Sequence, residues 1–326
     1  MDVGAVGEFG LIQRLAALVG RPQPQLVVGI GDDAAVWRQG DAYLIATTDS
    51  LVAGVHFLPG LHPWADVGWK ALAVNVSDVA AMGGVPDFAL VTLALPPTTS
   101  LAAVDDLYRG LDECARAYGV TVAGGDVVRA GELAVTVALL GHALTDARGR
   151  PLLLRRDGAR PGHALAVSGT LGDAAAGLEL LRAGTREGPL VAAQGRPRPP
   201  LSLGQEAARL GLPCAIDISD GLLQDLGHLC RLSGVGAVLR AAQLPLSEEL
   251  RRAFPDRALA LACSGGEDYQ LLLAGPRQVL ERLAQRGAAP LTIVGEAVAG
   301  EGVRVLDEAG QPLELAPTGW DHLRRP

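Results

Sequence analysis

Aspartates recur in this sequence at positions flanked by glycine, alanine, serine or threonine. Adjacent carboxylates such as Asp32 and Asp33, in GIGDDAAVW (29–37), repel one another unless a cation lies between or beside them. Oxygen ligands without cysteine, and with few histidines, favour Mg²⁺ over zinc or copper, and Mg²⁺ usually completes its shell with substrate phosphates. The pattern therefore predicts a multi-cation site for phosphate chemistry. Its further members are Asp49 in ATTDSL (46–51), Asp78 in NVSDVAAMGG (75–84), Asp126 in VAGGD (122–126), and Asp217 and Asp220 in AIDISDGL (215–222).

Each of these aspartates, taken singly, also has an ordinary structural interpretation as a helix cap, a turn residue or a solvated loop residue. Asp220 precedes GLL and could cap a helix. Asp78 is harder to explain in this way, because its small and apolar neighbours would bury it unpaired at a cost of roughly several kcal/mol. Asp32 is either a ligand or a support for its turn, and the sequence leaves both open.

Glycine-rich segments supply further candidates for phosphate binding. SGGEDYQLLL (264–273) offers backbone N–H groups followed by Glu267, whereas Gly172 and Asp173 fit ordinary helix capping. Arg156, in RRDGARPG (155–162), either clamps a phosphate or is solvated. Lys70 is the only lysine in the chain and lies in GWKAL (68–72), so a Walker A phosphate loop is excluded.

Hydrophobic periodicity predicts the elements that position these residues. In the first half we expect helices at 7–20, 64–84 and 101–119, and strands at 42–51, 88–97, 120–126 and 132–144. In the second half we expect strands at 164–170, 214–219, 235–240, 269–275, 291–298 and 302–307. The helices expected there are 173–184, 203–211, 220–234 and 276–287, with a loop over 184–200. The order predicts two α/β domains, joined by the arginine-, glycine- and proline-rich segment 145–163.

Composition limits the classes of function that remain. Hydrophobic residues make up 49% of the 326 residues, which is typical of a globular protein, and the net charge of −8 argues against a nucleic-acid partner. No apolar run of about 18 residues is present, so we expect no membrane segment and a cytoplasmic location. The four cysteines are scattered, which indicates neither a zinc site nor a disulfide framework.

Eight motifs, taken in order along the chain, resemble those of the thiamine-monophosphate kinases, in the superfamily of aminoimidazole-ribonucleotide synthetase. They are GEFGLI (7–12), GIGDDAAV, TTDSLVAGVHF (47–57), KALAVNVSDVAAMGG (70–84), AGGD, AIDISDGLLQDLGH (215–228), SGGEDYQLLL and GWDH (319–322). GVHF, SGGEDY and GWDH are specific to the kinase within the superfamily. The resemblance implies a two-domain α/β (α+β) fold, in which each domain is a mixed sheet covered by helices. It also implies a homodimer formed through the N-terminal domains.

The resemblance further implies ATP-dependent phosphorylation of thiamine monophosphate to thiamine diphosphate, the last step of thiamine diphosphate biosynthesis. Residues 1–148 would bind metal and ATP and dimerise, and residues 149–326 would complete the nucleotide and substrate sites. The implied Mg²⁺ ligands are Asp33, Thr47, Thr48, Asp49, Asp78, Asp126, Asp217 and Asp220, of which Asp78, Asp126 and Asp220 would act in catalysis through the metal. The implied ATP contacts are Tyr108, Gly125, Asp126, Arg156 and Ser219, and the implied substrate contacts are His56, Glu267 and Trp320. Because phosphoryl transfer needs mainly positioning and charge neutralisation, we expect direct in-line transfer with no protein nucleophile.

Three alternatives are weighed against this interpretation. Aminoimidazole-ribonucleotide synthetase would share the metal and ATP motifs but not GVHF or GWDH. Selenophosphate synthetase would need a reactive cysteine or selenocysteine in a glycine-rich N-terminal loop, whereas the first cysteine here is Cys114, on an expected helix. A non-catalytic relative that acts as a binding partner is disfavoured by the intact carboxylates.

Overall fold

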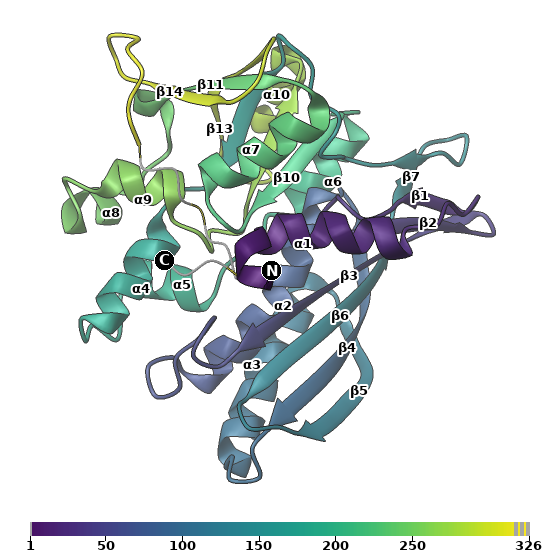
Figure 1. Ribbon diagram of the computed structural model, residues 1–326, viewed down its shortest axis with the longest axis vertical. Helices are drawn as coiled ribbons and strands as arrows, with labels where there is room; N and C mark the ends of the chain where they lie inside the picture. The colour runs from purple at the N-terminus through teal and green to yellow at the C-terminus, as the bar shows by residue number, and fades with distance from the viewer. Residues whose placement is uncertain (1, 316–318, 320–322, 324–326) are drawn as a thin grey trace.

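The N-terminal half is built on a six-stranded sheet that helices cover on one face (Figure 1). The computed structural model describes residues 2–315, 319 and 323. The sheet has the order β1 (Leu26–Val28), β2 (Ala35–Gln39), β3 (Ala42–Val52), β6 (Ala134–His142), β4 (Val85–Leu95) and β5 (Thr121–Arg129). Neighbouring strands are antiparallel except for the parallel pair β4 and β5. Helices α2 (Trp64–Ala81) and α3 (Leu101–Tyr118) pack on the same face, which leaves the opposite face uncovered.

The C-terminal half is a second six-stranded sheet, with helices on both faces. Its order is β10 (Cys214–Ile218), β12 (Gln270–Gly275), β9 (Ala164–Ser168), β13 (Leu291–Val298), β11 (Gly236–Arg240) and β14 (Val303–Leu306). Helix α7 (Leu222–Ser233) and helix α9 (Ala258–Ser264) pack on one face, and α6 (Leu201–Arg209) and α10 (Arg277–Gln285) pack on the other. The remaining elements are α1 (Val3–Val19), β7 (Leu144–Thr145), β8 (Pro151–Leu152), α4 (Asp173–Arg182), α5 (Pro189–Gly195), the 3₁₀ turn η1 (Ala241–Gln243) and α8 (Glu248–Ala253). The predicted mixed α/β fold with two sheets is confirmed.

Helix α2 is the element that the two halves share. Every residue from Val67 to Ala81 is buried except Asp78, because the helix packs against the first sheet, α3, and the second half. Ala80 and Ala81 belong to the same apolar cluster as Leu203 of α6. A helix buried on nearly all sides explains why its sequence is rich in alanine and valine, and why a carboxylate on it needs a partner.

Several elements differ from the sequence expectations, among them the short strands β2, β7 and β8, which were not expected. The segment 184–200 is not a continuous loop, because α5 forms within it behind a proline at its first position. Strand β5 continues through Asp126 to Arg129, so Asp126 does not end its strand. Helices α8 and α9 were not expected, since both are short and carry no clear amphipathic period. Among the described residues no helix is long and apolar enough to cross a membrane; the cytoplasmic location stays a prediction.

Close backbone contact between α2 and α3 depends on two glycines, and this makes a strong prediction about stability. A Cβ atom on Gly110 would lie 1.7 Å from the carbonyl oxygen of Ala65, and one on Gly68 would lie 1.8 Å from that of Leu107. We expect Gly110→Ala to lower the free energy of unfolding by about 3 kcal/mol, since the helices must separate. Urea denaturation measures this change. The control is Gly131→Ala, where no atom lies within 4 Å of the added Cβ; equal stability of the two variants would contradict the packing.

Candidate active site

A cavity of about 320 Å³ is lined by residues of both halves of the chain. Strand β3 and the loop after it contribute residues from one side, and the ends of β10 and the segment before β12 contribute from the other. Among the sequence-predicted residues, the lining contains Asp49, His56, Asp78, Asp217, Ser219, Asp220 and Glu267. The fold therefore brings together most of the residues that the motifs singled out.

Three carboxylates form a cluster, and two of them, Asp78 and Asp217, line this cavity. Asp33, Asp78 and Asp217 each offer an oxygen within 4.8 Å of the others, although they come from the loop after β1, from α2 and from β10. Thr47 Oγ1 donates a hydrogen bond of 2.5 Å to Asp78 Oδ2, and Ser77 Oγ donates one of 2.7 Å to Asp217 Oδ2. Two hydroxyl donors do not neutralise three carboxylates, so the cluster needs positive charge.

The electrostatics of the cluster favour a bound cation. Burial, followed by the charges of Asp49, Asp217 and Asp33, raises the pKa of Asp78 well above its ordinary value. Burial and the charge of Asp33 likewise raise the pKa of Asp217. The Asp33 side chain is fully buried, yet its Oδ2 has no hydrogen-bond partner among the described residues. A set of buried oxygen donors with one oxygen left unpaired fits Mg²⁺.

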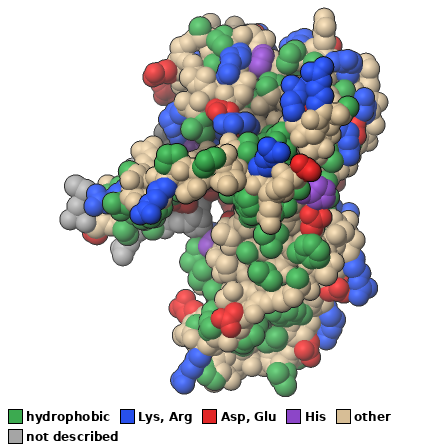
Figure 2. Space-filling model, turned by 90° about the vertical axis from the view of Figure 1, so that its right-hand side faces the viewer, with side chains coloured by type: hydrophobic (Ala, Val, Ile, Leu, Met, Phe, Trp, Pro, Cys, Tyr) green, Lys and Arg blue, Asp and Glu red, His purple; other side chains and the backbone are tan. Residues whose placement is uncertain are grey.

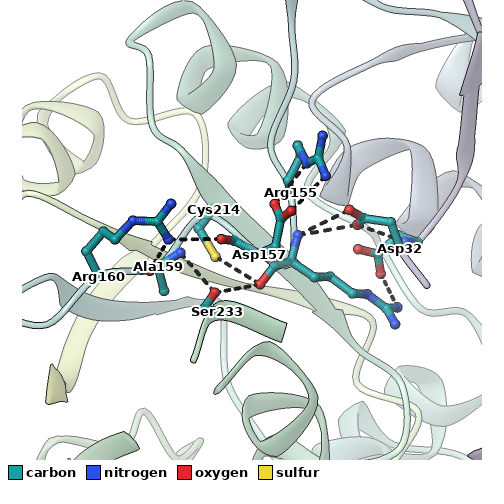
Figure 3. Close-up of polar contacts among 9 residues, drawn as sticks. Asp32, Arg155, Asp157, Ala159, Arg160, Cys214 and Ser233 are labelled. Atoms are coloured by element: carbon teal, nitrogen blue, oxygen red, sulfur yellow. Dashed lines mark hydrogen bonds and ion pairs between the residues drawn. The ribbon is translucent and has the colours of Figure 1, made fainter. Parts of the chain in front are cut away.

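Arg156 supplies the protein's own positive charge at the cluster. Its Nη2 donates a hydrogen bond of 2.6 Å to Asp33 Oδ1, and its side chain is one-fifth exposed. The segment that carries it is anchored to the second half, as Figure 3 shows: Cys214 Sγ and Ser233 Oγ both donate to the Arg156 carbonyl oxygen, at 3.7 and 2.9 Å. Arg156 is therefore not a solvated linker residue.

Asp32 holds the turn beside the cluster. Its Oδ1 accepts a hydrogen bond of 3.0 Å from the backbone N–H of Asp33, and its carboxylate faces the backbone N–H of Arg156 at 3.3–3.4 Å (Figure 3). Burial and the adjacent Asp33 raise the pKa of Asp32 to about 7. These contacts favour the turn-supporting role over that of a ligand.

The turn after β10 is held by a carboxylate that the sequence did not single out. Asp225 Oδ2 accepts the backbone N–H groups of Ser219, Asp220 and Gly221, each at 3.1 Å. Asp220 is thus not the helix cap: the N-cap of α7 is Gly221, and Asp220 instead lines the cavity. Asp225 orients the two candidate site residues of the turn, and its three donors explain how a buried carboxylate is tolerated there.

Two of the predicted substrate contacts, His56 and Glu267, lie on loops, and the loop that carries Glu267 has an unusual backbone geometry. Glu267 and Tyr269 have φ values of 72° and 48°, a left-handed conformation that is uncommon outside glycine. The loop is held to β10 because the Glu267 N–H donates to the Ser219 carbonyl at 2.7 Å, and the Tyr269 N–H to that of Ile218 at 2.8 Å. His56 Nδ1 accepts the N–H of Val52 at 3.1 Å. Trp320, the third predicted contact, lies outside the described residues.

Seven of the described predicted residues do not line this cavity within the single chain. Asp33, Thr47 and Arg156 belong to the carboxylate cluster or bond to it, whereas Thr48, Tyr108, Gly125 and Asp126 do neither. Thr48 is exposed, as expected for a residue that alternates with Thr47 along β3. Tyr108 is half-buried on α3 and packs against the core of the N-terminal half. Gly125 and Asp126 lie on β5, the exposed edge strand of the first sheet. Gly125 also has a structural reason to be glycine, because a Cβ atom there would lie 1.8 Å from the Val91 carbonyl oxygen.

Other residues near the cavity were not singled out as site residues, although Glu8 lies in the motif GEFGLI and Lys70 begins the motif KALAVNVSDVAAMGG. Glu8, His62 and Arg182 line it, and Lys70 and Gln194 contact Glu267 from behind. Lys70 also stands out as the chain's single lysine. Gln194 could not have been found, because its helix lies in the segment expected to be a loop.

Comparisons with known proteins agree with this geometry. Residues 31–143 match the family model described as "AIR synthase related protein, N-terminal domain", and residues 160–308 match that of the C-terminal domain. The chain is 38% identical over 334 residues to the thiamine-monophosphate kinase of Escherichia coli K12, covering 99% of this chain and 100% of that protein. It is 36% identical to the Aquifex aeolicus enzyme, with the same coverage. A solved structure described as "AaThiL complexed with AMPPCP and TMP" superposes with a TM-score of 0.87 at 35% identity, covering 99% of each chain.

Proposed function

Since the chain belongs to the thiamine-monophosphate kinases, a family of AIR synthase-related proteins, we propose that it transfers the γ-phosphoryl group of ATP directly to thiamine monophosphate at a multi-Mg²⁺ site. The coarser activity, ATP-dependent phosphorylation of thiamine monophosphate, has the support of relatives at 36–38% identity over their full length. The observation that carries the finer proposal is the cluster of Asp33, Asp78 and Asp217, of which Asp78 and Asp217 line the cavity that also contains His56 and Glu267.

The carboxylates and hydroxyls of the cluster are the proposed ligands of Mg²⁺. Asp33, Asp49, Asp78, Asp217 and Asp220 would hold the ions, with Thr47 contributing its hydroxyl beside Asp78. Bound Mg²⁺ would neutralise phosphate charge and bring the two anionic substrates together. Arg156 adds a fixed guanidinium near the cluster, and Ser219 lies on the turn that Asp225 holds, so both are proposed contacts of the nucleotide phosphates.

The protein's own groups then have to orient the reactants. An oxygen of the acceptor phosphate attacks the γ-phosphorus, the bond to the β–γ bridging oxygen breaks, and that oxygen leaves on ADP. The acceptor oxygen is already largely ionised, so no protein base is needed. The cysteines offer no nucleophile, because burial raises the pKa of Cys114, Cys214 and Cys263 to about 12 and that of Cys230 to about 11.

We also propose a homodimer that forms through the uncovered face of the first sheet. Figure 2 shows apolar side chains gathered over the lower part of that face, and the exposed apolar residues of β4 and β5 are Phe88, Leu90, Val122, Val127 and Val128. Apolar exposure on this scale is typical of an interface. Gly125 and Asp126 lie on the same edge strand, so we propose that they enter the nucleotide site in the dimer, with residues 1–148 as the dimerising domain and residues 149–326 completing the site. For the remaining residues we propose the roles that the family resemblance implies: Thr48 as a ligand of Mg²⁺, Tyr108 as a contact of ATP and Trp320 as a contact of thiamine monophosphate.

Initial-rate kinetics test the proposed reaction. Direct transfer requires both substrates to be bound together, so double-reciprocal plots with ATP and thiamine monophosphate varied should intersect, and ADP release should match thiamine diphosphate formation. An aminoimidazole-ribonucleotide precursor in place of thiamine monophosphate is expected to give no ADP. Parallel lines, or γ-phosphoryl label retained on the protein after ATP alone, would instead indicate a phosphoenzyme.

A further inference from the structure

Lys70 lies behind the cavity and is paired with Glu267. Its side chain is 3% exposed, and its Nζ lies 2.5 Å from Glu267 Oε1. The pair joins α2 in the N-terminal half to the strained loop before β12 in the C-terminal half. Lys70 is the only lysine of the chain, and the other cationic residues are arginines and histidines. The compact ammonium group of a lysine side chain is therefore used only at this buried position.

A chain of hydrogen bonds continues from Glu267 to the loop that carries His56. Gln194 Nε2 donates to Glu267 Oε2 at 3.2 Å, and Gln194 Oε1 lies 3.0 Å from His62 Nε2. His62 Nδ1 lies 3.0 Å from the backbone N–H of Leu58, nearer than the 3.4 Å to the Leu58 carbonyl oxygen. Hydrogen bonds therefore connect Glu267 to the 54–62 loop, which carries the other predicted substrate contact, His56.

The direction of every bond in this network is determined by chemistry. A backbone N–H can only donate, so His62 Nδ1 accepts and Nε2 carries the proton that is donated to Gln194 Oε1. The Gln194 amide is then oriented with its NH₂ group toward Glu267. Burial lowers the pKa of His62, which agrees with the neutral ring that this arrangement requires. Reversing any one group would leave two donors or two acceptors facing each other.

We propose that Lys70, Gln194 and His62 are positioning residues that hold the Glu267 carboxylate and the His56 loop in the geometry that binds thiamine monophosphate. The inference rests on the proposed function, which makes Glu267 and His56 substrate contacts. Lys70 and Gln194 each occupy one Glu267 oxygen from behind, and each oxygen keeps a second lone pair for a donor in the cavity. A fixed carboxylate suits a substrate that carries a cationic ring and an amino group. The left-handed φ of Glu267 is a strain that such a network has to maintain.

Paired kinetics of Lys70→Met and Gln194→Met test this role. Methionine matches glutamine in length and is one atom shorter than lysine, so each variant keeps most of the packing but removes the bond to Glu267. We therefore expect KM for thiamine monophosphate to rise about tenfold or more. KM for ATP should change less than about twofold, because Arg156 and the Ser219 turn are untouched. The matched control is Trp69→Phe, at the residue next to Lys70 on α2. It deletes another buried hydrogen bond, the one of 2.8 Å from Trp69 Nε1 to the carbonyl oxygen of Pro197, in the segment after α5. It should lower the melting temperature and leave KM for thiamine monophosphate unchanged.

Glu267→Gln separates failure of this inference from failure of the proposed function. If that variant leaves KM for thiamine monophosphate unchanged, the substrate role of Glu267 itself is wrong. If it raises KM while Lys70→Met and Gln194→Met behave like Trp69→Phe, the network is merely structural and the inference is overturned. The double variant Lys70→Met/Glu267→Gln removes both charges of the pair, so it leaves no unpaired charge buried. If Lys70 acts only by positioning Glu267, the KM of this double variant for thiamine monophosphate should be no higher than that of Glu267→Gln alone.

Discussion

Turnover of the Asp78→Asn variant is expected to fall ~10²-fold or more while the protein stays folded. The Asp78 carboxylate offers an oxygen within 4.8 Å of oxygens of Asp33 and Asp217, and Thr47 donates a hydrogen bond to its Oδ2. The amide removes the charge that would help hold Mg²⁺ where the two substrates meet. The measurement is kcat with saturating ATP, thiamine monophosphate and Mg²⁺.

Stability measured without metal gives this prediction a second readout. Because burial and three neighbouring aspartates raise the pKa of Asp78, its charged form costs folding free energy at neutral pH, and the neutral amide removes that cost. The metal-free variant should therefore melt no lower than the parent protein, although it is nearly inactive. The control is Asp41→Asn, a fully exposed aspartate, which should alter neither quantity. Near-normal turnover of folded Asp78→Asn would contradict the cluster as the catalytic centre.

The sequence predicted the site residues best where the hydrophobic pattern of a single helix or strand also determines where its aspartate lies. The long alanine- and valine-rich helix around Asp78 is confirmed within three residues at its C-terminal end, and its burial was evident from the lack of polar neighbours. The strand that carries Asp217 is confirmed as well, because CAIDIS is a short, mostly apolar run that directly precedes a helix start. That these two carboxylates share a site was inferred from strand ends and from family motifs, and in the structure their oxygens lie within 4.8 Å of each other. Their role as Mg²⁺ ligands stays a prediction.

Long-range partners were beyond what local pattern can predict. The bond between Lys70 and Glu267 joins residues 197 positions apart, and neither side chain signals the other. Gln194 lies in a proline- and glycine-rich segment, where the helix α5 forms because it packs on α4, not because of its own periodicity. Asp126 follows two glycines, which suggested a strand end, whereas the pairing of β5 with β4 extends the strand beyond it. In each case tertiary contacts override local preference.

The raised pKa of a second carboxyl group, that of Asp268, leads to a prediction of how the stability of the protein depends on pH. Burial raises the pKa of Asp268 to about 8, even though its oxygens accept the backbone N–H of Gly172 at 2.8 Å and that of Ala174 at 3.5 Å. An unfolded aspartate has a pKa of about 3.9. The neutral acid is therefore favoured in the folded protein, and its contribution to stability is fully present below about pH 4 and is lost as the pH rises to about 8.

Asp268→Asn should remove this dependence, because an amide does not ionise yet can still accept the Gly172 N–H. Each pH unit between the two pKa values is equivalent to about 1.4 kcal/mol. The free energy of unfolding of the parent relative to the variant should thus fall by on the order of 4 kcal/mol between pH 5 and pH 8. Urea denaturation of both proteins at several pH values, in Mg²⁺-free buffer, gives the difference. The ionisable groups of the metal cluster are the same in both proteins, so their contributions cancel in that difference. A difference that stays constant across this range would mean that the two backbone donors keep Asp268 ionised and that its burial costs little.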